Sequence, residues 1–467
     1  MSLTMPIAPD IWQNELPDWV ADLPSGWKVR RLKHIATVKP SNVDKKTVEG
    51  QEHVRLCNYV EVYNNDFITA DMPFMEATAT DSQIKAFALR RGDVLITKDS
   101  ETWDDIAVPA LVRDELDGVI CGYHLAHISP HKKSMLGGYL FRAFSATGVR
   151  DQFRIGANGI TRFGITSYRI NNAIFPVPPL PEQHAIAEFL DRKTAEINGL
   201  IVKKQRLIDL LGEKRQALIS HAVTKGLNPD APMKDSGIEW LGEVPEHWKV
   251  ERLKFCITKI EQGWSPQCES RPADEDEWGV LKVGCVNQDE FTQDEQKALP
   301  PEFEVPHRYE VSNGDILMSR GNTRELVGSA ALLKKVRPRL LLCDLLYRFR
   351  ARERVVDPQF LVWQLRSPTV RYQIERAASG TSSSMKKIGQ ETIRNFWIVR
   401  PPLSEQKEII RHVNSELRSV DGVSAIVESQ IENLREYRQT LISAAVTGKL
   451  DVKDLGAVAQ VQGCLND

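Results

Sequence analysis

Two stretches of the chain carry the same long helical pattern, and they constrain the fold more than any other feature. PPLPEQ introduces the first stretch at residues 178–183 and PPLSEQ the second at residues 401–406, 223 positions later. In both stretches apolar residues recur at every seventh position, with further apolar residues between them, which is the pattern of a coiled coil. A helix of ~42 residues at ~1.5 Å per residue would be ~63 Å long, far longer than an ordinary globular helix. The seven-residue row contains Leu190, Ile197, Lys204, Leu211 and Leu218 in the first copy, where Lys204 is the one charged member, and Val413, Val420, Val427, Leu434 and Leu441 in the second.

The segments before each helix repeat as well. PSGWKVRRLK at residues 24–33 is echoed by PEHWKVERLK at residues 245–254, and GDVLIT at residues 92–97 is echoed by GDILMS at residues 314–319. The offset stays within two residues of 223 throughout. A constant offset over this length predicts a tandem duplication, in which each half is one domain followed by one long helix.

The predicted fold class is α+β: two tandem-duplicated α/β domains separated by two long antiparallel coiled-coil helices. The antiparallel arrangement is expected because a folded domain returns the chain between the two helices. Within the first domain, residues 118–128 are predicted to form one buried strand. The predicted boundaries are residues 1–181 for the first domain, 182–226 for the first long helix, 227–244 for a linker, 245–403 for the second domain, 404–450 for the second long helix and 451–467 for a tail.

Composition favours a soluble protein of more than one domain. The chain has 467 residues, of which 42% are hydrophobic and 27% are charged. No apolar run reaches the ~20 residues that a membrane helix needs, and the first residues lack a signal-peptide pattern. We therefore expect a cytoplasmic protein. Seven cysteines without a CxxC pair indicate reduced, mostly packed thiols.

Charge is distributed unevenly, although the formal net charge is only −2. Residues 261–310 contain 13 acidic and 4 basic side chains, whereas residues 334–400 contain 15 basic and 5 acidic ones. Residues 131–170 of the first half show a weaker basic excess. Basic charge concentrated in one part of each half is typical of phosphate binding, and a solvated basic face without a partner is the alternative.

Several motifs together resemble the specificity subunit of type I restriction-modification enzymes. They are the two PPL-x-EQ helix starts, the GD(V/I)L strands, the helix ends RQALISHAVTKGL and RQTLISAAVTGKL, and the linker MKDSGIEWLGEVPEHW. The resemblance covers nearly the whole chain. It implies two target recognition domains that each read one half of a split, asymmetric double-stranded DNA sequence.

The residues expected to contact DNA lie in two segments of each domain. One segment follows the GD strand, and the other is a basic segment rich in Gly or Ser that precedes the long helix. Such loops can approach DNA closely, with Lys and Arg on phosphates and polar groups on base edges. The candidates are Lys98, Asp99, Ser100, Arg154, Asn158, Thr161 and Arg162 in the first domain, and Arg320, Asn322, Thr323, Arg324, Ser382, Ser383, Ser384, Lys386 and Lys387 in the second.

By the same resemblance, the long helices hold the domains apart and bind partners. Two methyltransferase subunits that use S-adenosylmethionine would pack there, and restriction subunits that use ATP and magnesium would join them. This chain itself would hold no cofactor. The solvent face of the helices, with Arg192, Lys193, Arg418 and Glu432, is the predicted partner surface. The Glu-Gln pairs 182–183 and 405–406 are expected to serve the helix starts.

No catalytic motif is evident, so a recognition subunit is predicted and not an enzyme. The GxxxxGK[ST] phosphate loop is absent. His124, His127 and His131 could suggest a metal site, but a strand would point the first two to opposite faces, and we predict no metal. A nuclease-like pattern of Asp276 with Glu295-x-Lys297 lies in the acidic stretch, where DNA would be repelled.

Three other functions compete with the prediction. A stand-alone DNA-binding regulator would be stable without partners and would bind DNA tightly by itself. A coiled-coil scaffold would leave the assembled complex without sequence preference. A single-chain methylating and cutting enzyme would need further domains, and the duplicated units already occupy this length.

Overall fold

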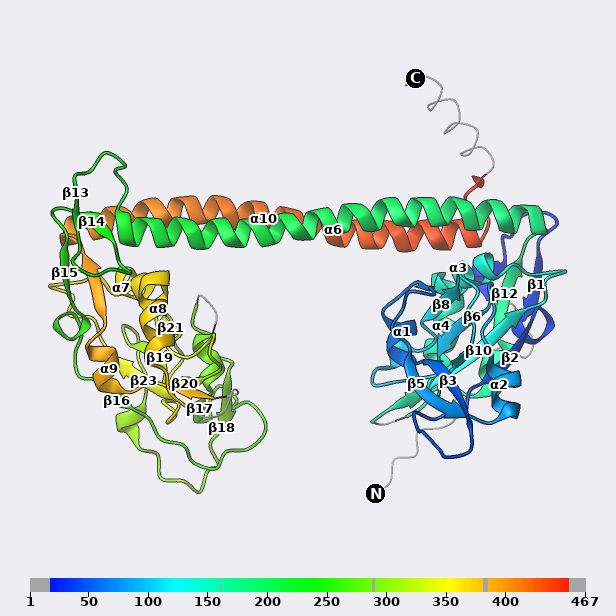
Figure 1. The fold of residues 1–467 in the computed structure, drawn as a ribbon, viewed down its shortest axis with the longest axis horizontal. Helices are drawn as coiled ribbons and strands as arrows, with labels where there is room; N and C mark the ends of the chain where they lie inside the picture. Colours follow the sequence, from blue (N-terminus) through cyan, green and yellow to red (C-terminus); the bar gives the residue numbers. More distant parts are fainter. Residues whose placement is uncertain (1–16, 160, 288–289, 381–384, 453–467) are drawn as a thin grey trace, which may run out of the picture. The chain divides into compact units, whose positions relative to one another are not determined.

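The computed structural model describes residues 17–159, 161–287, 290–380 and 385–452. The chain divides into two compact units, Met1–Gln205 with Glu428–Asp467 and Arg206–Val427. Helices and strands are mixed in both units (Figure 1), as the α+β prediction requires. Two long helices, α6 (Leu180–Lys225) and α10 (Leu403–Val446), contribute one part to each unit.

The first unit is built on a five-stranded sheet in the order β2-β10-β6-β8-β4, with a second sheet in the order β5-β3-β9. Its strands are β1 (Lys28–Arg31), β2 (Ala36–Pro40), β3 (Glu52–Cys57), β4 (Phe67–Ile68), β5 (Met75–Ala79), β6 (Val94–Thr97), β7 (Asp99–Ser100), β8 (Pro109–Val112), β9 (Val119–Cys121), β10 (Leu125–Pro130), β11 (Phe163–Gly164) and β12 (Ile174–Val177). Its shorter helices are α1 (Tyr59–Tyr63), α2 (Asp81–Phe87), α3 (Gly137–Ser145), α4 (Thr147–Gly156) and α5 (Ser167–Asn172).

The second unit has a four-stranded sheet in the order β16-β23-β19-β21 and a three-stranded sheet in the order β18-β17-β22. Its strands are β13 (Met233–Asp235), β14 (Glu243–Pro245), β15 (Lys249–Arg252), β16 (Glu261–Gln262), β17 (Gly279–Leu281), β18 (Gln296–Ala298), β19 (Ile316–Ser319), β20 (Gly321–Asn322), β21 (Ala330–Leu332), β22 (Leu340–Leu341), β23 (Leu346–Phe349), β24 (Lys386–Lys387) and β25 (Trp397–Arg400). Its shorter helices are α7 (Pro358–Arg366), α8 (Pro368–Ala377) and α9 (Gln390–Arg394).

The two GD motifs start equivalent central strands. Gly92 adopts a φ of +93° at the third position of a turn, and the backbone N–H of Asp93 donates to the carbonyl of Arg90 at 3.0 Å. This is a type II turn, which requires a positive φ and therefore favours glycine. At the start of β19, Gly314 likewise has a positive φ, and the N–H of Asp315 donates to the carbonyl of Ser312. The strands β6 and β19 are fully buried, and each pairs antiparallel with both neighbours.

The stretch 118–128 is not one strand as predicted. It forms β9 and β10, which belong to different sheets and are separated by residues 122–124. His124 has a positive φ of 66°, a conformation that a strand cannot continue through. The apolar pattern correctly indicated burial, but the turn inside it carries no Pro or Asn signal.

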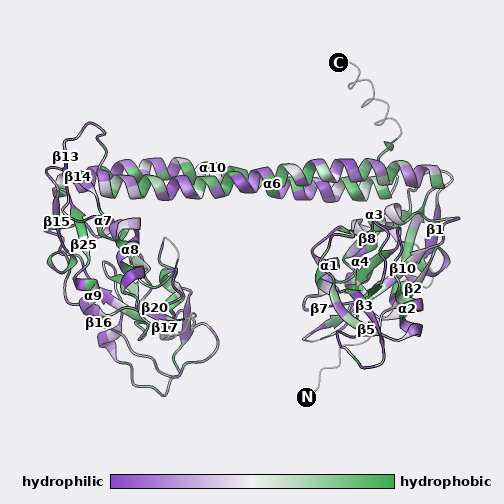
Figure 2. Ribbon diagram, in the orientation of Figure 1, coloured by the Kyte–Doolittle hydropathy of each residue, from purple (hydrophilic) through white to green (hydrophobic). Residues whose placement is uncertain are grey.

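The long helices pack against each other within each unit. In the first unit, Arg438 donates to Asn198 at 2.6 Å and Lys204 to Gln430 at 2.6 Å, so residue numbers rise along α6 as they fall along α10. In the second unit, Arg215 lies 3.3 Å from Asp421. Hydrophobic and hydrophilic residues alternate along both helices (Figure 2), and every residue of the predicted seven-residue row is buried or half-buried.

The Glu-Gln pairs at the helix starts do more than the prediction assigned to them. Gln183 is fully buried; its Oε1 accepts from the backbone N–H of Leu136, and its Nε2 donates to the carbonyls of Ser134 and Pro178, all at 2.9 Å. In the same way, Oε1 of Gln406 accepts from the backbone N–H of Asp357, and its Nε2 donates to the carbonyls of Val355 and Pro401. These amides therefore tie each long helix to the segment that precedes α3 or α7, in addition to their place at the helix starts.

Thiols are packed as expected. Five of the six cysteines in the described part of the chain are buried, and Cys268 is partly buried. Burial raises the pKa of Cys256 and of Cys343 to about 12. Thiols of this kind remain protonated and are poor nucleophiles at neutral pH.

Candidate nucleic-acid interface

The first unit brings the two predicted DNA-contact segments together. β7, directly after the GD strand, pairs antiparallel with β11 in the Gly-rich basic segment, so that Ser100 faces Phe163 and Asp99 faces Gly164. An isolated bridge between Asn158 and Gly164 extends the pairing. Residues about sixty positions apart thus form one short two-stranded ribbon, which we call the first ribbon (residues 98–100, 158 and 163–164).

The second unit contains the same construction. β20, which follows the second GD strand, pairs antiparallel with β24, so that Gly321 faces Lys387 and Asn322 faces Lys386. A bridge between Ser379 and Lys387 extends it. We call this the second ribbon (residues 320–322, 379 and 386–387). Ser382, Ser383 and Ser384, which were also predicted to contact DNA, lie outside the described residues.

Lys98 and Arg320 hold the same backbone position in the two ribbons. The N–H of Lys98 donates to the carbonyl of His124 at 2.9 Å, and the N–H of Arg320 donates to the carbonyl of Leu345 at 2.8 Å. In turn, the carbonyl of Lys98 accepts from the N–H of Ile165, and the carbonyl of Arg320 accepts from the N–H of Ile388. Each half of the chain therefore places one cation at the start of its ribbon.

Aromatic rings accompany the cations of the first ribbon. The Nζ of Lys98 lies 4.5 Å from the centre of the Tyr123 ring and donates to the carbonyl of Ser41 at 3.1 Å. The guanidinium of Arg154 lies 6.0 Å from the ring of Trp103, which is 55% exposed, and donates to the carbonyl of Asp104 at 3.1 Å. These contacts hold the charged groups at the surface, where phosphate can reach them.

The predicted residues differ in their accessibility. Ser100 is buried beside Tyr59, with the two hydroxyls 3.4 Å apart, and Asn322 donates to Asn287 at 2.9 Å while its Oδ1 accepts from the N–H of Thr323. Ser100 is therefore in a position to support the ribbon. The exposed candidates are Asn158, Thr161, Arg162, Arg324 and Lys387. The half-buried candidates are Lys98, Asp99, Arg154, Arg320, Asn322, Thr323 and Lys386.

Sequence reasoning missed two neighbours of the first ribbon, Tyr123 and His124. Nδ1 of His124 lies 2.8 Å from Oδ2 of Asp99, and the rings of Tyr123 and His124 meet edge to face at 4.4 Å. The signal available in the sequence was the histidine itself, which was considered only as a metal ligand. The other two histidines have different partners, Asp93 for His127 at 2.7 Å and Thr37 for His131 at 3.3 Å. In the described part of the chain, no group of three His, Cys, Asp or Glu side chains could hold a metal ion.

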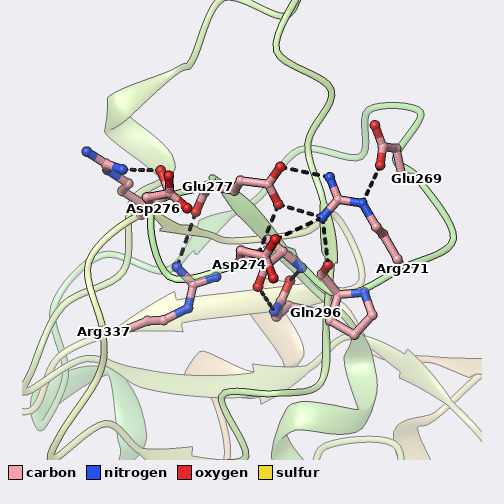
Figure 3. Close-up of polar contacts among 10 residues, drawn as sticks. Glu269, Arg271, Asp274, Asp276, Glu277, Gln296 and Arg337 are labelled. Carbon is pink, nitrogen blue, oxygen red and sulfur yellow. Dashed lines mark hydrogen bonds and ion pairs between the residues drawn. The ribbon is translucent and has the colours of Figure 1, made fainter.

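The acidic stretch of the second unit forms a closed network of charges (Figure 3). Arg271 binds Glu277 through two nitrogens at 2.6 and 2.7 Å and also binds Glu269 at 2.8 Å. The hydrogen bonds from Arg271 lower the pKa of Glu277 to about 2. Of the nuclease-like pattern, Asp276 accepts a hydrogen bond from Arg339 through its backbone carbonyl, and Glu295 pairs with Lys282 at 3.8 Å. These contacts therefore stabilise the loop around Arg271.

The residues predicted to bind partners lie on the surface of α6 and α10. Arg192, Arg418 and Glu432 are exposed, and Lys193 is half-buried. Lys193 pairs with Glu196 at 2.8 Å, and Glu432 pairs with Arg435 at 3.4 Å. None of the helices in the described residues has the length and apolar character needed to cross a membrane.

Comparisons with known proteins agree with this geometry. Residues 24–208 match the model of the type I restriction modification DNA specificity domain. The type I restriction enzyme EcoEI specificity subunit of Escherichia coli is 28% identical over 241 residues, which are 51% of this chain and 40% of that protein. The EcoKI specificity subunit of Escherichia coli strain K12 is 24% identical over 446 residues, which are 92% of this chain and 90% of that protein.

The fold also matches a solved structure. A chain described under "Structural basis underlying complex assembly and conformational transition of the type I R-M system" superposes with a TM-score of 0.63 at 18% identity, covering 92% of this chain and all of that chain. The fold is a mixture of helices and strands in which each unit carries one ribbon. Residues 24–208 therefore carry a type I restriction modification DNA specificity domain, and the chain is similar to type I specificity subunits over most of its length. The two relatives are named as specificity subunits, the class that the sequence motifs resemble.

Proposed function

We propose that this chain selects the DNA target of a type I restriction-modification complex by reading two different half-sites, one with each ribbon. The observation that carries the proposal is the recurrence of one construction in both units, where the strand after the GD motif pairs with the basic segment. Each ribbon offers cations for phosphates and polar side chains for base edges, the two kinds of contact that position and specify.

The half-sites should differ because the ribbons differ at equivalent positions. Lys98-Asp99-Ser100 in the first ribbon stands where Arg320-Gly321-Asn322 stands in the second. Side chains of different donor and acceptor character select different base pairs in the major groove. An asymmetric, bipartite target follows, whereas two identical readers would favour a palindrome.

The finer architecture belongs to the same proposal. The two units descend from a tandem duplication, supported by the constant offset and by the matching bonds of Gln183 and Gln406. The long helices α6 and α10 form an antiparallel coiled coil, supported by their buried seven-residue row. The predicted domain boundaries are part of this scheme.

Partners supply the chemistry. Two methyltransferase subunits bind the charged faces of α6 and α10 and bring S-adenosylmethionine, and restriction subunits bring ATP and magnesium. The complex works in the cytoplasm, where its DNA substrate lies. The support for this assignment is the family itself and the exposed, charged residues of the two helices.

Methylome sequencing tests the proposal directly. Cells that carry this chain with the methyltransferase of its own system should show a split, asymmetric methylated motif that disappears when this chain alone is removed. A domain exchange provides the second arm: replacing residues 1–181 by those of a relative should change one half of the motif only. Methylation that does not depend on the chain would favour the stand-alone regulator or the scaffold.

A further inference from the structure

The backbone of His124 is held in an unusual conformation beside the first ribbon. Its φ of 66° lies in the left-handed region, which non-glycine residues seldom adopt and which is found more often at functional sites. Its carbonyl accepts the N–H of Lys98 at 2.9 Å, so the residue is tied to the start of the ribbon. This conformation places the imidazole next to Asp99 on β7.

Asp99 fixes which ring nitrogen of His124 faces outward. A carboxylate only accepts hydrogen bonds, so the contact of 2.8 Å between Oδ2 and Nδ1 assigns the proton to Nδ1. A protonated Nδ1 cannot also accept from Arg162, whose Nη2 lies 3.3 Å away and contributes positive charge beside the pair. In the neutral ring, Nε2 is then an acceptor, and the side chain is 26% exposed.

We propose that His124 is a base-reading residue of the first unit, whose Nε2 accepts a hydrogen bond from the exocyclic amino group of an adenine or cytosine in the major groove. This inference rests on the proposed function and deepens it. The amino groups of adenine and cytosine are the donors that the major groove presents, while guanine and thymine present acceptors there. Asp99 is the positioning residue, since it sets the tautomer and the direction of the ring.

The surroundings of His124 suit DNA contact. Tyr123, which is 42% exposed, packs edge to face against the imidazole and gives it an apolar wall. The Nζ of Lys98 lies over the Tyr123 ring, 4.5 Å from its centre. A cation for phosphate and an oriented acceptor for a base thus stand side by side.

The second unit shows that the fold does not require this pair. Leu345 takes the place of His124, because its carbonyl accepts the N–H of Arg320 at 2.8 Å. Gly321 takes the place of Asp99, and a Cβ added there would lie 3.4 Å from a methyl group of Leu345. A leucine and a glycine at the same point of the second ribbon cannot form the His-Asp hydrogen bond, which favours a role in recognition over a role in folding.

The test uses the full chain in complex with its methyltransferase subunits, after the methylome has given the target. In His124→Gly the left-handed backbone is retained without strain, so the variant should fold while the ring is lost. Binding is measured on duplexes that carry every single substitution in both half-sites. We expect His124→Gly to lose about tenfold of discrimination at one adenine or cytosine in one half-site, the size of a single base-edge hydrogen bond, and to keep all other preferences. Leu345→Ala is the matched control and should leave that position unchanged.

A base analogue identifies the atom that is read. At the sensitive position, purine replaces adenine or 2-pyrimidinone replaces cytosine, each of which lacks the exocyclic amino group. The wild-type complex should bind the analogue about tenfold more weakly, whereas His124→Gly should bind both duplexes equally.

Other outcomes would overturn the inference in distinguishable ways. A preference profile of His124→Gly identical to the wild type, or a uniform weakening at every position, would leave His124 without a reading role while the proposed function stands. A wild-type complex without any bipartite preference would overturn the proposed function itself.

Discussion

The indole Nε1 of Trp27 donates a hydrogen bond to Oε2 of Glu182 at 2.8 Å, across 155 residues of chain. In the second half Trp248 donates to Oε1 of Glu405 at 3.0 Å, and His247 adds a contact to the same carboxylate at 2.7 Å. The W-K-V motif near the start of each half and the Glu-Gln pair at each helix start therefore form one joint. This joint explains why the two motifs occur together in both halves.

Replacing the buried amide at a helix start should destabilise its unit. Gln183→Leu leaves one backbone N–H and two carbonyls of the first unit without their partner, and each unsatisfied group costs roughly 1–3 kcal/mol. We expect the free energy of unfolding to fall by about 3 kcal/mol, measured by urea denaturation. Gln205→Leu, at an exposed position of the same helix, should change it by less than about 0.5 kcal/mol. Equal effects of the two substitutions would contradict the assigned role.

The ion pair between Arg142 and Asp191 should also contribute to stability. Arg142 is only 2% exposed, and two of its nitrogens donate to Oδ1 of Asp191 at 3.0 and 2.6 Å. Asp191→Asn leaves a buried guanidinium without its counter-charge, and because the carboxylate is 30% exposed we expect a loss of about 2 kcal/mol, below the range for fully buried pairs. Thermal unfolding measures the loss, with exposed Asp209→Asn as the control. An unchanged melting temperature in Asp191→Asn would show that solvent already screens this pair.

Lys387 should contribute a phosphate contact without sequence information. It is exposed on β24 of the second ribbon. We expect Lys387→Ala in the assembled complex to weaken binding to all duplexes alike and to reduce the slope of log K against log salt by about 1, because each neutralised phosphate releases about one counterion. Lys249→Ala is the control, since β15 lies beside the start of α10 in Figure 1 and away from the ribbon, and it should leave the slope unchanged. A loss confined to particular sequences would mean that Lys387 reads a base.

The charge network around Arg271 should persist in acid. The pKa of Glu277 is lowered to about 2, compared with about 4.3 for an ordinary glutamate in an unfolded chain. A lowered pKa in the folded state means that the pairing stabilises the loop fully above the unfolded value and loses its effect as the pH falls through about 2. Carboxyl NMR of the selectively labelled chain should therefore show the midpoint of Glu277 near 2. In Arg271→Gln the midpoint should rise towards the ordinary value, whereas in Arg308→Gln it should stay low.

Local patterns in the sequence were sufficient for several features. The seven-residue apolar row indicated the long helices, and α6 and α10 run over those stretches. The GD motif indicated a strand start, because a type II turn needs a positive φ at Gly92. The motif combination resembles type I specificity subunits, and residues 24–208 match the model of that specificity domain. Each of these signals lies within a few neighbouring residues or repeats at a fixed period.

Other features depended on contacts between distant parts of the chain. The ribbons join segments about sixty residues apart, and no local pattern predicts that Asp99 faces Gly164 or that Gly321 faces Lys387. Burial separated Ser100 from the exposed candidates, although all of them occur in similar loop sequences. The role of His124 was hidden for the same reason, since its partner Asp99 stands 25 positions earlier and its left-handed backbone has no sequence signal.

The sequence by itself therefore determined the constant offset of the repeated motifs, the seven-residue apolar row and the resemblance to a family, because periodicity and turn chemistry are properties of the chain read along its length. The tertiary structure alone decided which loops meet, which polar groups are buried and which nitrogen of His124 faces outward. Those outcomes depend on strand register and on hydrogen bonds between residues far apart in the sequence, and they become fixed only when the two sheets and the helices of each unit pack together.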